Sequence, residues 1–111
     1  MNTYEAMFLI NAKLDEKATN AIFDQIKETI TKNEGNIISS RLWAEKKQLS
    51  FPIRKHQEAT YYIANFKLQP DSIDKLRQVY RLNENILRVL IIRLNEDIVR
   101  FSKQEKHSSN A

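Results

Sequence analysis

The sequence predicts an α+β domain in which a four-stranded antiparallel sheet carries two helices on one face. Four segments are rich in aromatic and β-branched residues, two others carry apolar residues at helical spacing, and the six follow the order β-α-β-β-α-β. This order defines the ferredoxin-like, split βαβ arrangement. With 111 residues, the chain fits a single domain, which we place at residues 1–101 and follow with a polar C-terminal tail at residues 102–111.

The first strand is expected at residues 3–10, where the sequence reads Thr-Tyr-Glu-Ala-Met-Phe-Leu-Ile. Both faces of this segment are largely apolar, so the strand should lie in the middle of the sheet. A helix should follow, because Asp15 is a good N-cap and isoleucine recurs every four residues after it. Gly35 is the only glycine of the chain and is expected to end this helix in the left-handed conformation.

The second strand is expected at residues 36–53, where apolar residues alternate imperfectly. The slip between Ile37 and Trp43 indicates a β-bulge or a strong twist. Pro52 cannot donate to a strand ladder, so it belongs on an edge strand, at a bulge or at a strand end. An edge strand that carries both aromatic and basic residues is a plausible docking element for RNA or for a protein.

The second half of the chain repeats the pattern. Residues 56–59 are polar and should form a turn, and residues 60–68 have high strand propensity. A second helix should begin at Pro70, and residues 86–94 form the most apolar of the predicted strands. The buried stripe of the second helix is expected to contain Ile73, Leu76, Val79 and Tyr80.

Two helices can cover only one side of such a sheet. The residues expected beneath the helices are Ala6, Phe8, Ile10, Tyr62, Phe66, Leu68, Val89 and Ile91. The opposite side is expected to show Met7, Leu9, Tyr61, Ile63, Leu90 and Ile92. A side that faces water should be polar, and these six predicted neighbours are not, so we interpret them as the face that binds a protein partner. Apolar residues scattered singly over a surface would need no such explanation.

Basic residues gather in the second predicted strand. The net charge is +4 and the pI is near 9.4, a mild bias that favours a polyanionic partner. Residues 41–55 hold five basic residues against one acid, Glu45. Three of them are candidates for contacts with RNA phosphates on charge alone: Lys46, Lys47 and Arg54. A solvated strand rim would show the same clustering, so charge leaves both interpretations open.

Enzymatic chemistry is not expected. The chain has no cysteine, and neither His56 in its polar segment nor His107 in the tail has a nucleophile placed beside it. A single glycine excludes a glycine-rich phosphate loop, and no metal-ligand spacing is present, so we expect no metal and no cofactor. No apolar run approaches a membrane span, and no signal peptide is visible. Residues 60–66 lack the pattern by which RNA-recognition motifs stack bases on their third strand.

Several stretches together resemble the bacterial small-subunit ribosomal protein S6 family. They are Tyr4-Glu5, Gly35, Leu49-Ser50-Phe51-Pro52-Ile53-Arg54-Lys55, and Leu82 with Asn85-Ile86-Leu87-Arg88. The family pattern around the proline is Leu-Ala-Tyr-Pro-Ile-x-Lys, and the spacing agrees over residues 3–94. Ala59 departs from the family, which commonly has glycine there.

The resemblance implies a non-enzymatic component of the small ribosomal subunit, cytoplasmic and associated with the ribosome. It implies binding to the central domain of 16S ribosomal RNA together with ribosomal protein S18, which would pack on the sheet, and no membrane or small-molecule substrate. By position, Lys55 is expected to meet a phosphate and Arg88 to lie at the margin between sheet and RNA. The alternative is a protein-only interaction module that dimerises through its open sheet face.

Overall fold

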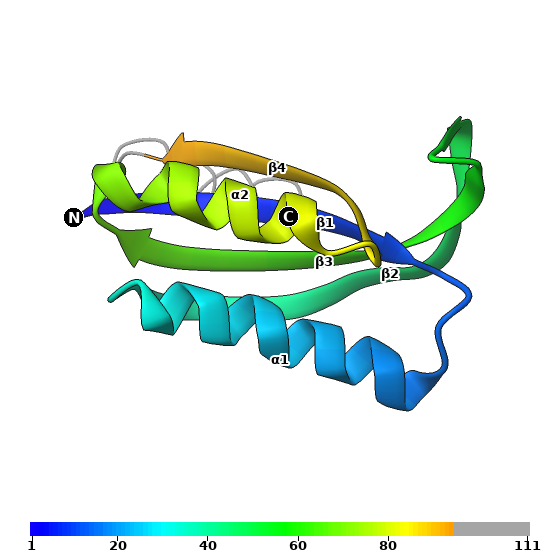
Figure 1. The fold of residues 1–111 in the computed structure, drawn as a ribbon, viewed down its shortest axis with the longest axis horizontal. Helices are drawn as coiled ribbons and strands as arrows, with labels where there is room; N and C mark the ends of the chain where they lie inside the picture. The colour runs from blue at the N-terminus through cyan, green and yellow to red at the C-terminus, as the bar shows by residue number, and fades with distance from the viewer. Residues whose placement is uncertain (95–111) are drawn as a thin grey trace, which may run out of the picture.

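The predicted order of strands and helices is present in the computed structural model, which describes residues 1–94 (Figure 1). The strands are β1 (Asn2–Asn11), β2 (Asn36–Ile53), β3 (His56–Leu68) and β4 (Ile86–Leu94). The helices are α1 (Glu16–Lys32) and α2 (Ile73–Leu82), and a 3-10 turn, η1 (Pro70–Ser72), precedes α2. The domain end expected at residue 101 and the tail at residues 102–111 lie outside the described residues.

The sheet has the strand order β2-β3-β1-β4, and every neighbouring pair is antiparallel (Figure 1). β1 therefore lies between β3 and β4, as its two apolar faces predicted. β2 is an edge strand, and its register against β3 slips at four places, so the predicted irregularity is also confirmed. The fold class expected from the sequence is correct.

The main core lies between the sheet and the helices. All eight residues predicted for this side belong to the core or pack against it: Ala6, Phe8, Ile10, Tyr62, Phe66, Leu68, Val89 and Ile91. Helix α1 begins at the predicted cap, where the Asp15 carboxylate accepts a hydrogen bond from the Ala18 N–H at 2.8 Å. From α2, the Tyr80 ring meets the Phe8 ring edge to face, with 4.8 Å between the centroids.

One residue of α2 is not where the sequence predicted it. Ile73, Leu76 and Tyr80 are buried, whereas Val79 is 46% exposed. The three buried residues follow a spacing of three and then four and so define one stripe of the helix. Val79 lies roughly 100° around the helix from Tyr80, at the flank of that stripe, so the prediction that it is buried was wrong.

Gly35 is required for a different reason from the one expected. The left-handed residue at the end of α1 is Glu34, with φ of 65°, and Gly35 does not have a positive φ. The Glu34 N–H donates to the Thr31 carbonyl at 3.0 Å and the Gly35 N–H donates to the Ile30 carbonyl at 2.9 Å, which is the Schellman pattern with Glu34 at its left-handed position. A Cβ on Gly35 would lie 2.7 Å from Ile30 Cγ2 and 2.9 Å from Leu68 Cδ1. Glycine is therefore needed for close packing.

The turn between β2 and β3 was placed too late. Ile53 pairs with His56, so the loop consists of Arg54 and Lys55 alone, and β3 begins at His56 rather than at residue 60. Both loop residues have positive φ, 48° for Arg54 and 69° for Lys55, as two-residue hairpins of the type I′ class require. Neither residue is glycine or asparagine, and for this reason the sequence did not mark the turn.

Replacing Gly35→Ala should destabilise the fold, because the added methyl group would overlap Ile30 and Leu68. We expect the free energy of unfolding to fall by about 1–3 kcal/mol in urea denaturation, the range found for overpacked cores. Glu34→Gly is the matched control, since it relieves a left-handed residue one position away and should not reduce stability. A Gly35→Ala chain as stable as the original would contradict the packing argument.

Replacing Tyr80→Phe should remove a buried hydrogen bond, in which the Tyr80 hydroxyl donates to the Ile26 carbonyl at 2.8 Å. We expect a loss of about 1 kcal/mol in the free energy of unfolding at neutral pH. Burial also raises the pKa of the Tyr80 phenol well above its ordinary value. The unfolded chain therefore releases this proton near pH 10 while the folded chain keeps it, and stability should fall as pH rises beyond about 10. A Tyr80→Phe chain with an equally steep decline would show that Tyr80 is not its cause.

Candidate nucleic-acid and protein interface

The helix-free face of the sheet is formed by alternate residues of β1, β3 and β4. Met7 pairs with Ile63 on one side and Leu90 on the other, and Leu9 pairs with Tyr61. None of the six residues predicted for this face belongs to the core beneath the helices. The structure thus brings the six together on the side expected from the sequence.

These six residues differ in exposure. Leu90 is 46% exposed and Ile92 is 54% exposed, and Met7 and Tyr61 are half-buried. Leu9 and Ile63 are only 5% and 7% exposed, so the expectation that all six line an open surface was wrong for these two. The uncovered part of the face is therefore centred on β4 and the adjoining part of β1.

Leu9 is covered by the β2–β3 hairpin. Figure 1 shows the paired ends of β2 and β3 bending out of the sheet at one corner. Leu9, Ala59 and Leu87 form a second buried cluster, and Leu49 and Ile53 of the hairpin pack against it. The slips in the β2 register permit this bend, because each β-bulge adds local twist and re-aims the strand. Sequence reasoning missed this second core, since it depends on how far the hairpin bends.

The predicted RNA-binding residues lie in four separate places. Lys47 lies on the helix-free side, with its Nζ 4.8 Å from the centroid of the Trp43 ring. Lys46 instead lines a hollow at the start of α1 together with Glu16 and Glu45. Arg54 and Lys55 form the hairpin tip, and Arg88 pairs with Leu9 at the start of β4.

All five of these basic side chains are exposed: Lys46, Lys47, Arg54, Lys55 and Arg88. Within residues 1–94, the ion pairs are those of Lys27 with Asp24 and Arg77 with Asp74, both on helices. The five predicted residues are therefore not held by carboxylates in the described part of the chain. Their charges are available to a polyanion.

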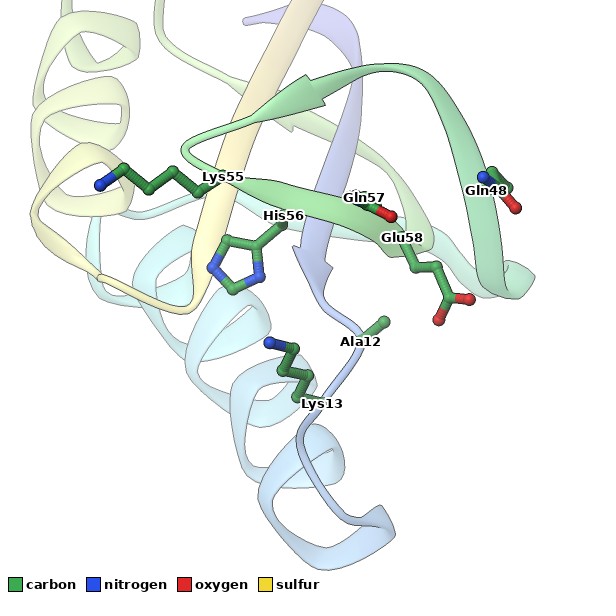
Figure 2. Close-up of a pocket in the computed structure, with 7 residues that line it drawn as sticks. All are labelled: Ala12, Lys13, Gln48, Lys55, His56, Gln57 and Glu58. Atoms are coloured by element: carbon green, nitrogen blue, oxygen red, sulfur yellow. The ribbon is translucent and has the colours of Figure 1, made fainter.

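A hollow of about 290 Å³ lies between the hairpin and the connection that follows β1 (Figure 2). Its basic residues are Lys13, Lys55 and His56, and Glu58 supplies a carboxylate. Figure 2 shows the Lys13 and His56 side chains extending toward the same space, while Lys55 extends away from it. The Lys13 ammonium and the His56 imidazole thus border the same space. No pattern in the sequence could identify this pair, because the bend of the hairpin brings Lys13 and His56 together.

Asn65 places a polar atom on the helix-free side. It pairs with Glu5 of β1 and Ser39 of β2, and its side-chain Oδ1 is buried without a hydrogen-bond donor among the described residues. An unsatisfied buried acceptor costs about 1–3 kcal/mol. The sequence signal was a polar residue within an otherwise apolar strand.

Residues 1–94 lack two further features. They contain no group of three or more histidine, cysteine, aspartate or glutamate side chains placed to hold a metal ion. Neither of the helices in this range is long and apolar enough to cross a membrane.

Solved structures with a similar fold include ribosomal protein S6 of the 30S subunit of Thermotoga maritima. It superposes with a TM-score of 0.78 at 21% identity, over 97% of each chain. The C-terminal domain of the MgtC protein from Mycobacterium tuberculosis superposes with a TM-score of 0.57 at 11% identity, over 86% of this chain and 90% of that one. At such identities the similarity shows the fold alone.

Sequence comparison is more specific. The small ribosomal subunit protein bS6 of Rhodopirellula baltica is 33% identical over 99 residues, which are 89% of this chain and 70% of that protein. The bS6 protein of Helicobacter pylori strain 26695 is 37% identical over 84% of this chain, which spans 65% of its length. That of Caldanaerobacter subterraneus is 33% identical over 86% of this chain and all of its own length.

The model of the family described as Ribosomal protein S6 matches residues 3–93, nearly all of the described chain. The match includes the proline segment of β2 and the start of β4, on which the resemblance in the sequence rested. This chain belongs to the ribosomal protein S6 family.

Proposed function

We propose that this chain binds the central domain of 16S ribosomal RNA together with ribosomal protein S18, as a structural component of the small ribosomal subunit. Its family supports the general part of this assignment, because the relatives are proteins of the small ribosomal subunit and not enzymes. Such a protein works where ribosomes are, in the cytoplasm. The observation that supports joint binding with ribosomal protein S18 is the helix-free face, which remains apolar and partly uncovered.

The uncovered part of this face suits a protein partner. Leu90 and Ile92 are about half exposed, and covering the remainder of each should contribute about 1 kcal/mol. The exposed part of the surface therefore fits a partner that brings apolar side chains, and we assign this role to ribosomal protein S18.

The hairpin end of the face suits RNA. Arg54 and Lys55 lie at the hairpin tip, and Arg88 follows Leu87, which belongs to the cluster covered by the hairpin. These cations border the apolar face, so a partner bound there would extend one continuous surface toward the RNA backbone. Release of counterions from the phosphates would then favour binding and make it sensitive to salt.

The alternative function uses the same exposed residues. A second copy of the chain could cover Leu90 and Ile92 in a homodimer that needs no RNA. Light scattering at low and high salt separates the two functions, because a tight dimer that is insensitive to salt favours the alternative. Co-sedimentation of the chain with small ribosomal subunits tests the ribosomal assignment directly, and a chain that stays at the top of the gradient would refute it.

Replacing Leu90→Asp and Ile92→Asp together should abolish binding to ribosomal protein S18, because two carboxylates would be buried without partners. We expect affinity to fall by a factor of about a hundred or more in calorimetric titration, since each buried charge costs several kcal/mol. The free energy of unfolding should fall by only about 2 kcal/mol, since about half of each side chain is buried in the chain itself.

Leu82→Asp is the control for this pair, since Leu82 is 83% exposed on α2. It should leave partner binding unchanged and lower the free energy of unfolding by no more than about 1 kcal/mol, because a carboxylate in the last turn of α2 opposes the helix dipole. Ile63→Asp is unsuitable because Ile63 is 7% exposed and the change would destabilise the fold itself. Undiminished binding by the Leu90→Asp, Ile92→Asp chain would remove the sheet face from the partner interface.

A triple variant removes three of the basic charges: Arg54→Gln, Lys55→Gln and Arg88→Gln. Its complex with ribosomal protein S18 should bind RNA more weakly. The slope of log affinity against log salt should become shallower by about 2–3, since each phosphate contact contributes roughly 0.7–0.9. Filter binding over a series of salt concentrations measures this slope. Lys75→Gln, at an exposed position on α2, is the matched control and should leave it unchanged. An unaltered slope in the triple variant would exclude these residues from the RNA contact.

A further inference from the structure

The only tryptophan of the chain lies on the surface of the edge strand. Trp43 is 47% exposed and belongs to neither of the two apolar clusters of the described residues. Its ring lies edge to face against Tyr61, with 5.2 Å between centroids and 65° between planes. The Nζ of Lys47 lies 4.8 Å from the Trp43 centroid and 5.9 Å from that of Tyr61. We call Trp43, Tyr61 and Lys47 the Trp43 platform.

The backbone of β2 is irregular around this platform. The register against β3 slips between Leu42 and Ala44 and again between Ala44 and Lys47. Within the second slip, Lys46 has a positive φ of 46°, and its N–H donates to the Thr60 hydroxyl at 3.4 Å. Bulges change the direction in which neighbouring side chains point. Here they leave Lys47 above the Trp43 ring while Lys46 lines the hollow beside α1.

The surroundings of the platform are cationic. Arg41 is exposed two positions before Trp43, and neither Arg41 nor Lys47 forms an ion pair among residues 1–94. The nearest acid along the strand, Glu45, lines the hollow shared with Lys46. Because β2 is an edge strand, no further strand of the described chain blocks the approach from outside.

We propose that the Trp43 platform stacks an unpaired nucleobase of RNA while Lys47 contacts a phosphate of the same strand. This inference rests on the proposed function, for which it names a contact. An exposed aromatic ring beside a free cation has the features by which single-stranded nucleic acids are bound, since every base has a face that can stack. An apolar protein surface would have to desolvate Lys47 without neutralising it, whereas a phosphate neutralises it directly.

The site differs from the base-stacking surface of RNA-recognition motifs, whose pattern is missing from β3. The exposed ring lies on the edge strand, and Tyr61 of β3 supports it from the side. It also differs from the basic hairpin tip, where Arg54 and Lys55 are expected to contact phosphates only. Such contacts do not require an unpaired base. A double strand keeps its bases stacked on one another, so it should not engage Trp43.

The emission of Trp43 tests the inference in the intact chain, since it is the only tryptophan. The full chain is titrated at low salt with a single-stranded oligonucleotide of eight nucleotides and with a duplex of the same length. We expect the single strand to quench the emission to saturation and the duplex to leave it unchanged. Absent quenching, or equal quenching by the duplex, would overturn the inference without the use of any variant.

Variants then identify the contact by binding of a fluorescently labelled single strand. Trp43→Leu should weaken binding about tenfold, and Trp43→Phe should retain most of the affinity because a ring that can stack remains. Lys47→Gln should make the salt slope shallower by about 0.7. Phe51→Leu is the matched control, since Phe51 is an aromatic residue of the same strand that is 81% exposed, and should change nothing. Equal affinities of the Trp43→Leu and original chains would overturn the stacking contact.

The fluorescence titration tests the stacking contact and co-sedimentation tests the ribosomal role, so either result can be negative without the other. A chain that sediments with small subunits but whose emission ignores single strands keeps the proposed function and loses this inference. A chain whose emission responds but which does not sediment keeps the stacking contact and loses the ribosomal role. A change of emission that appears only when ribosomal protein S18 is added would assign Trp43 to the protein interface and overturn the inference.

Discussion

The sheet is apolar on both faces, but both helices pack against the same one, and the remaining features of the molecule depend on this imbalance. On the helix side, the apolar residues are buried in a continuous core within the chain. On the opposite side, the apolar residues are buried only in part, where the hairpin covers Leu9 and its neighbours. Leu90 and Ile92 remain in water. A surface of this kind is stable in solution and gains free energy when a partner covers it.

The hairpin links the two halves of the proposed function. By bending over the helix-free side, it packs Leu49 and Ile53 against the sheet and sets Arg54 and Lys55 at its tip. The same backbone irregularities separate Lys46 from Lys47 and place Lys47 over Trp43. The local departures of β2 from a regular strand thus decide which basic groups face a partner and which do not.

The fold alone does not decide what this chain does. A domain of the MgtC protein has a similar arrangement at 11% identity, so the architecture serves proteins of different kinds. The family is shown by residues 3–93 taken together. Gly35 is one of these residues and has a clear structural role. The single glycine of the chain lies where the end of α1 approaches Leu68 too closely for any side chain.

The sequence by itself determined the order of strands and helices, the fold class and the side of the sheet on which the apolar strand residues lie. These follow from alternation along strands and from helical spacing, which are properties of neighbouring residues. Only the tertiary structure decided the role of Gly35, the position of the hairpin loop, the burial of Leu9 and the meeting of Lys13 with His56. Each of these depends on how closely segments distant in the chain approach one another, and no local pattern encodes that distance.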